Sequence, residues 1–126
     1  MDIEGKVVVV TGAGAGIGAA LAEAAASRNS RAVIVADKNG ENATKVAEKI
    51  NGIPHEVDVS DENQIRNMVA TIEHKHGPID LFCSNAGFVT SAGLEDANER
   101  IQKMWEVHVM AHIYAARAVL PQMIAN

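Results

Sequence analysis

The sequence has 126 residues, with 11 Lys and Arg against 16 Asp and Glu, so its formal net charge is −5. That length suits one domain over residues 1–126, and an acidic balance without a basic cluster argues against nucleic acid or a membrane surface as partner. No apolar run reaches the ~18 residues that cross a bilayer and no basic leader opens the chain, so we expect a cytoplasmic protein. The single cysteine, Cys83, excludes an internal disulfide and a thiolate zinc cluster.

Short β-branched runs alternate with longer helix-forming stretches, which is typical of βαβ units and a parallel sheet. We expect strands at residues 6–11, 31–37, 54–59 and 79–84 and helices at 16–27, 41–50, 61–76 and 97–125, with a loop over 85–96. Ser60 is expected to cap the third helix, and Asn51-Gly52 to end the second. Right-handed crossovers would join these units into an open parallel sheet with helices on both faces, which is half of a doubly wound fold.

A glycine-rich turn follows the first predicted strand and opens the first predicted helix. Glycine allows a tight turn and a close approach of the backbone, and a helix N-terminus offers free N–H groups to a pyrophosphate. We therefore predict a phosphate-binding turn made of Gly12, Gly14, Ala15, Gly16, Ile17 and Gly18. The alternative is a flexible loop of small residues.

An acidic residue, Asp37, ends the second predicted strand about 20 residues after the glycines. Its carboxylate is suited to accept hydrogen bonds from the hydroxyls of an adenosine ribose, and its charge would repel a 2′-phosphate. This predicts NAD as cofactor in preference to NADP. The alternative is an ordinary aspartate that starts the turn Lys38-Asn39-Gly40.

The spacing Gly12-x-x-x-Gly16-x-Gly18 after a threonine resembles the short-chain dehydrogenase/reductase family. The Asp58-Val59 pair is similar to the adenine-contacting Asp of that family and the backbone amide after it, and Ser84-Asn85-Ala86-Gly87 is similar to its Asn-Asn-Ala-Gly stretch. The resemblance implies a Rossmann-type α/β sheet with strand order 3-2-1-4. It adds Asp58, Val59, Asn85, Ala86 and Gly87 to the expected cofactor-binding residues.

The resemblance also implies an activity, which is hydride transfer between NAD(H) and an alcohol or carbonyl. The family's catalytic serine, tyrosine and lysine follow the last helix and have no counterpart here, and Tyr114, with Ala118 four residues later, is expected to pack in the core. We therefore expect a truncated chain that supplies the dinucleotide-binding half, has no catalytic residues and is inactive alone. The alternative is a non-catalytic nucleotide-binding or self-associating interaction protein.

Three further residues could carry chemistry. His108 stands where the family usually has an asparagine, and we expect an exposed helix residue. His108 and His112 share an i, i+4 spacing, but no third ligand is identifiable, so no metal site is expected. Cys83 lies inside an apolar strand, where a structural thiol is expected.

Self-association is expected from two exposed surfaces. The fourth strand should form a sheet edge with Ile79, Leu81, Phe82 and Cys83, and such an edge invites pairing with another chain. The last helix should contribute a symmetric contact through Val107, Met110, Ala111, Tyr114 and Ala115. We therefore expect a homo-oligomer.

Overall fold

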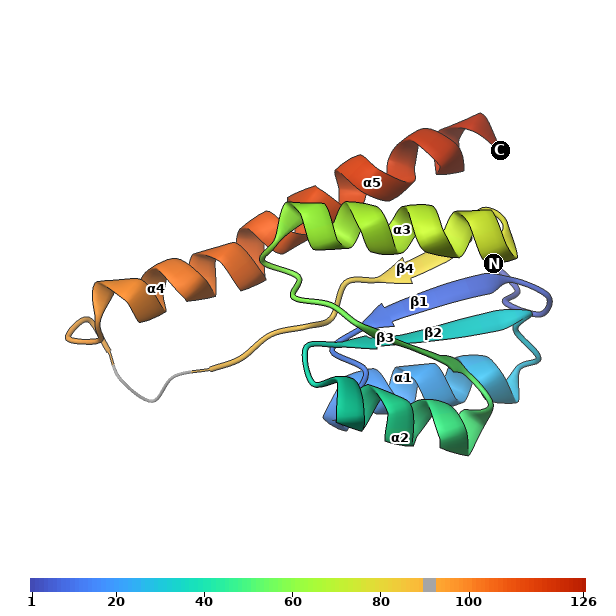
Figure 1. Cartoon of the computed structure of the whole chain (residues 1–126), viewed down its shortest axis with the longest axis horizontal. Helices are drawn as coiled ribbons and strands as arrows, with labels where there is room; N and C mark the ends of the chain where they lie inside the picture. Colours follow the sequence, from blue (N-terminus) through green and yellow to red (C-terminus); the bar gives the residue numbers. More distant parts are fainter. Residues whose placement is uncertain (90–92) are drawn as a thin grey trace.

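The sheet of the computed structural model, which describes residues 1–89 and 93–126, has four parallel strands in the order β3-β2-β1-β4. The strands are β1 (Val7–Thr11), β2 (Ala32–Asp37), β3 (Ile53–Glu56) and β4 (Leu81–Cys83). Helices cover both faces of the sheet (Figure 1). The predicted fold class and strand order are therefore confirmed.

The core consists of two apolar layers, one on each face of the sheet, because successive strand residues point to opposite faces. Val7 and Val9 of β1 pack with α3 (Glu62–His76) and α5 (Ala111–Ala125). Val8 and Val10 pack with α1 (Gly16–Ser27) and α2 (Gly40–Ile50). All four valines are fully buried, and each such side chain stabilises the fold by roughly 1.5–3 kcal/mol.

The third strand ends earlier than the sequence predicts, at Glu56 and not at residue 59. Val57 still donates its N–H to the Asp37 carbonyl oxygen, at 3.0 Å. At Asp58 the chain turns, because this side chain accepts hydrogen bonds from the Ser60 N–H and hydroxyl, and such local bonds compete with a strand ladder. Asp58 and Val59 thus lie in the loop between β3 and α3.

Asp61, and not the predicted Ser60, caps the N-terminus of α3. The Asp61 carboxylate accepts the N–H groups of Asn63 and Gln64, at 3.0 and 3.3 Å. Ser60 is left free to bind Asp58. At the end of α2, Asn51 adopts a left-handed conformation with φ 56°, which agrees with the predicted helix stop.

The predicted single helix over 97–125 is interrupted by a π-helical turn. Its parts are α4 (Asn98–Trp105), η1 (Glu106–Met110) and α5. A π turn carries an extra residue and shifts the helix face on either side of it. Val107 of η1 is buried in the core, whereas no residue of α4 is buried and α4 projects from the body (Figure 1).

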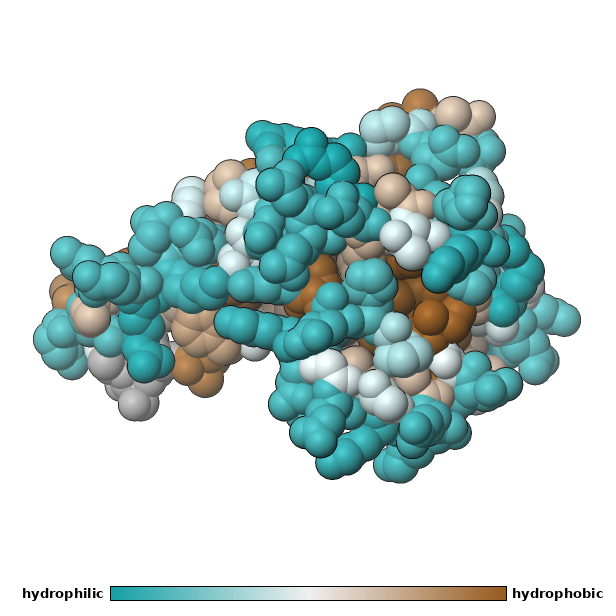
Figure 2. Space-filling view, in the orientation of Figure 1, coloured by the Kyte–Doolittle hydropathy of each residue, from teal (hydrophilic) through white to brown (hydrophobic). Residues whose placement is uncertain are grey.

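The face seen in Figure 2 is hydrophilic over the helices, and hydrophobic side chains show between α2 and α3. The edge strand β3 runs across this gap (Figure 1). Its half-buried Ile53 packs against the core there. Over residues 1–89 and 93–126, no helix is both long enough and apolar enough to cross a membrane.

Candidate functional site

The glycine turn between β1 and α1 packs closely against two other segments. A Cβ at Gly12, where φ is 68°, would lie 2.7 Å from the Cα of Ala86. A Cβ at Gly14 would lie 2.8 Å from the carboxylate of Asp37 and 2.9 Å from the Cβ of Asn42. Distances below 3 Å leave no room for a side chain, so glycine is required where the turn meets these neighbours.

The N-terminus of α1 has no side-chain cap. Ala15 occupies the N-cap position, and the first turn holds no acidic residue. The first backbone bond of the helix runs from Ala19 N to Ala15 O, at 3.2 Å. Ile17 at this end is 75% exposed. The N–H groups of the first turn thus have no side-chain cap, and a phosphate can accept them.

Asp37, at the end of β2, is held by two backbone N–H groups. Its Oδ2 accepts from Gly14 N and its Oδ1 accepts from Asn39 N, both at 2.8 Å. Each carboxylate oxygen has a second lone pair, so Asp37 can still accept ligand hydroxyls. The first of these bonds fixes the distance between the glycine turn and the end of β2.

Thr11 joins the end of β1 to the segment after β4. This buried hydroxyl accepts the N–H groups of Asn85 and Ala86, at 3.0 and 3.2 Å. The side-chain amide of Asn85 donates in return to the Thr11 carbonyl oxygen, at 3.1 Å. Asn85 therefore acts as a brace for the backbone, while Ala86 and Gly87 border the recess beside it.

A recess of about 390 Å³ opens at the carboxyl ends of the strands. Six of the sequence-predicted residues line it, namely Gly12, Asp37, Asp58, Val59, Ala86 and Gly87. The other six, Gly14, Ala15, Gly16, Ile17, Gly18 and Asn85, belong to the glycine turn, the start of α1 and the brace. Four further residues line the recess without being predicted by the sequence motifs, namely Lys38, Phe88, Lys103 and Val107. Lys38 could have been found because it follows Asp37, whereas Lys103 gives no local signal.

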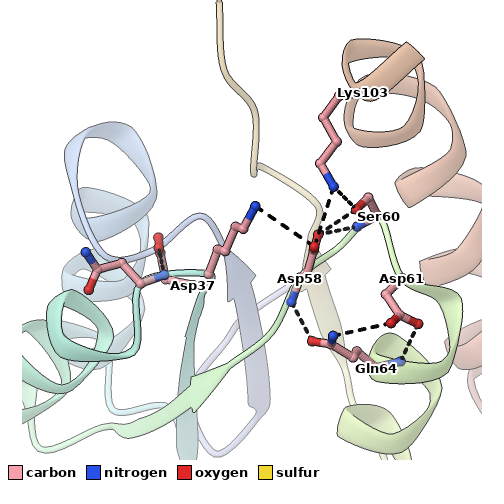
Figure 3. Close-up of polar contacts among 8 residues, drawn as sticks. Asp37, Asp58, Ser60, Asp61, Gln64 and Lys103 are labelled. Carbon is pink, nitrogen blue, oxygen red and sulfur yellow. Dashed lines mark hydrogen bonds and ion pairs between the residues drawn. The ribbon is translucent and has the colours of Figure 1, made fainter. Parts of the chain in front are cut away.

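Asp58 is the centre of a polar network in the wall of this recess (Figure 3). Its Oδ1 accepts from the N–H and hydroxyl of Ser60, at 3.0 and 2.6 Å. Its Oδ2 lies 3.5 Å from Lys103 Nζ and 4.0 Å from Lys38 Nζ. Burial raises the pKa of Asp58, but the Ser60 hydrogen bonds and the two ammonium charges outweigh that effect, so the pKa lies below its ordinary value.

The two histidines of the last helix have separate partners. His108 Nε2 lies 2.6 Å from the carbonyl oxygen of Phe88, and His112 Nδ1 lies 2.6 Å from Ser84 Oγ. His108 is exposed, as expected. Within the ranges 1–89 and 93–126, no group of three or more His, Cys, Asp or Glu side chains is placed to hold a metal ion.

Cys83 and Tyr114 both lie outside the recess. Cys83 is half-buried in β4, and burial raises the pKa of its thiol. Tyr114 is partly buried and packs against the core, as expected.

A family model described as short chain dehydrogenase matches residues 6–126. The chain belongs to the short-chain dehydrogenase family. It is 33% identical over 129 residues to estradiol 17-beta-dehydrogenase 11 of Rattus norvegicus, with 98% of this chain and 43% of that protein covered. The predicted family is confirmed.

Solved structures of this family share the fold. A short-chain dehydrogenase from Streptomyces avermitilis superposes with a TM-score of 0.87 at 31% identity, covering 98% of this chain and 46% of that one. A hydroxysteroid dehydrogenase from Escherichia coli superposes with a TM-score of 0.90 at 25% identity, covering 96% of this chain and 51% of that one. The chain thus spans about half the length of the relatives it matches.

Proposed function

We propose that this short-chain dehydrogenase chain binds NAD(H) and forms the dinucleotide-binding half of an oxidoreductase acting on an alcohol or carbonyl. The bond from Gly14 N to Asp37 carries this proposal. It places the open N-terminus of α1, suited to a pyrophosphate, beside a carboxylate suited to a ribose. The residues present therefore fit a dinucleotide, which supplies the hydride chemistry when bound.

Each part of the proposed cofactor has residues suited to it. The N–H groups at the start of α1, including that of Ile17, would bind the pyrophosphate. Asp37 would accept the hydroxyls of the adenosine ribose. The recess bordered by Asp58, Val59 and Ala86 would hold the adenine, between a carboxylate acceptor and apolar side chains.

The charges around Asp37 support NAD in preference to NADP. A second, open depression borders Asp37 on the side of α2, and its lining includes the carboxylates of Glu41 and Glu56. Lys38 is the one basic residue among the lining residues. Three negative charges against one positive charge disfavour a 2′-phosphate.

Calorimetric titration with NAD and NADP tests the proposal. We expect NAD to bind, NADP to bind more weakly, and Asp37→Ala to weaken NAD binding because the ribose hydroxyls lose their acceptor. Asp37→Asn keeps the shape of the side chain and removes its charge, so it should reduce the difference in affinity between NAD and NADP. No binding of NAD by the folded chain would refute the proposal.

We further propose that residues 1–126 bind the nucleotide without catalysing its reduction. Among the described residues that line the recess there is no serine or tyrosine to transfer a proton. Tyr114 packs against the core from α5. Steady reduction of NAD by an alcohol with the purified chain, followed by absorbance, would contradict this inactivity.

The second candidate function is that of a self-associating interaction protein. The surface that favours it includes the β4 edge of the sheet and the exposed side chains of Ile113, Leu120 and Ile124 on α5. The expected contact residues are revised, because Val107, Ala111 and Ala115 of the last helix are buried within this chain. Ile79, expected on the exposed edge, is also buried and lies before β4. Preserved self-association in a chain that binds no nucleotide would favour this candidate. A cytoplasmic location stays a prediction.

A further inference from the structure

Helix α4 is joined to the rest of the fold by few contacts. None of its residues is buried, and Trp105 and Ile101 are 54% and 45% exposed. The ion pair from Arg100 to Asp96 is local to this segment. Within the part of the chain that the structure describes, Lys103 makes the one hydrogen-bonded side-chain contact between α4 and the α/β body.

Lys103 closes a small ring of polar groups with Asp58 and Ser60 (Figure 3). Its ammonium donates to Ser60 Oγ, at 2.5 Å, and lies 3.5 Å from Asp58 Oδ2. The Ser60 hydroxyl donates in turn to Asp58 Oδ1, at 2.6 Å. The same Lys103 and Asp58 side chains line the recess, so one side chain connects α4 with the wall of the proposed adenine site.

We propose that Lys103 is a positioning residue of the nucleotide site, which fixes the Asp58 carboxylate and couples nucleotide binding to the attachment of α4. The inference rests on the proposed nucleotide binding. The Oδ1 atom of Asp58 already accepts two donors from Ser60, so Oδ2 is the oxygen with lone pairs left for a ligand. Lys103 determines where Oδ2 lies.

Lys38 is a poor substitute for this role. Its Nζ lies 4.0 Å from Asp58 Oδ2, and its side chain is 71% exposed, against 36% for Lys103. An exposed ion pair at such a distance orients a carboxylate weakly. Because coupling between two binding events is reciprocal, a nucleotide held by Asp58 should also stabilise the contact of Lys103 and therefore of α4.

The first test measures NAD and AMP binding to the whole chain by calorimetry. Lys103→Met keeps the length of the side chain and removes its charge, and Lys103→Arg keeps the charge. We expect Lys103→Met to weaken both ligands about three- to fivefold and Lys103→Arg to bind within about twofold of the parent chain. The matched control is Lys49→Met, because Lys49 is exposed on α2 and does not line the recess. This variant should bind NAD and AMP with the affinities of the parent chain.

The second test follows the amide hydrogen exchange of residues 98–105. NAD should increase the protection of these amides in the parent chain and in Lys103→Arg. It should leave them unchanged in Lys103→Met. If Lys103 merely stabilised the helix, Lys103→Met would lower the protection of these amides by the same amount with and without NAD.

The third test is the pH profile of NAD binding. The charged groups that face Asp58 are Lys38, from the segment after β2, and Lys103, from α4. Removing the Lys103 charge should raise the pKa of Asp58, so acid should abolish binding at a higher pH in Lys103→Met than in the parent chain. Lys103→Arg should restore the parent profile.

The outcomes separate this inference from the proposed function. A folded parent chain that binds neither NAD nor AMP overturns both. If the parent chain binds NAD, and Lys103→Met has the same NAD affinity and the same amide hydrogen exchange over residues 98–105, only the proposed role of Lys103 is overturned. If Lys103→Met fails to fold, Ser60→Ala serves instead, because it removes the hydroxyl that accepts the hydrogen bond from Lys103. Unchanged NAD affinity and unchanged amide hydrogen exchange in that variant would likewise overturn the inference.

Discussion

The backbone N–H of Gly14 donates a 2.8 Å hydrogen bond to the carboxylate of Asp37, across 23 positions of the sequence. This bond joins the turn after β1 to the end of β2. It also explains the glycine, because a Cβ at position 14 would lie 2.8 Å from Asp37 Cγ. The proposed pyrophosphate and ribose positions are therefore set by one contact.

Gly14→Ala should destabilise the chain by about 1–3 kcal/mol and weaken NAD binding, because the added methyl group pushes Asp37 away from the turn. Thermal unfolding and calorimetry measure the two effects. The control is Gly40→Ala, where the nearest neighbour of the new Cβ would be the exposed Glu56 side chain, at 3.2 Å. Equal melting temperatures for the two variants would show that the Gly14 contact is not tight.

Gly87→Ala should displace the His108 ring, because a Cβ at position 87 would lie 2.7 Å from His108 Cε1. The displaced ring loses its 2.6 Å contact with the Phe88 carbonyl oxygen, at a cost of about 0.5–1.5 kcal/mol. In a His108→Ala background the same glycine substitution should cost almost nothing. Unfolding in urea gives the four free energies of this double-mutant cycle, and additive effects would argue against the contact.

The pKa of His55 should rise in Lys75→Met. Burial and then the charge of Lys75 hold this pKa below its ordinary value, and the variant removes only the second cause. The folded chain binds fewer protons at His55 than the unfolded chain, so this group's contribution to stability is complete above the ordinary pKa and is lost as the pH falls. NMR titration of the His55 ring protons measures the shift, and Lys49→Met, which changes an exposed lysine of α2, is the control.

Cys83 should react slowly with a thiol-specific alkylating reagent in the folded chain. Burial in β4 raises its pKa, so less thiolate is present at a given pH than in the unfolded chain. Rates measured across a pH series should give a midpoint above that of the chain in denaturant. Identical midpoints in the two states would show that the thiol is freely solvated.

Leu120→Glu should weaken self-association of the chain. Leu120 is 47% exposed on α5, next to the exposed Ile124, so a charge there would be desolvated in an apolar contact between copies. Sedimentation velocity over a micromolar concentration series measures the association. A parent chain that stays monomeric throughout would rule out the expected oligomer.

Periodicity and glycine spacing are local signals, so the order of strands and helices and the position of the glycine turn can be predicted from the amino-acid sequence. The strand order 3-2-1-4 came with the family resemblance, and the structure confirms it. The spacing also predicts Asp37, because this residue follows a recognisable strand and lies about 20 positions after the glycines.

Which groups meet at the recess depends on the packing of the folded chain. Lys103 lies 43 positions from Ser60, and Asn85 lies 74 positions from Thr11, so no local pattern reports either contact. The early end of β3 is different, because Asp58 and Ser60 lie two positions apart and their hydrogen bond is local. The two long-range contacts depend on side chains that become neighbours only when the sheet and its helices have packed.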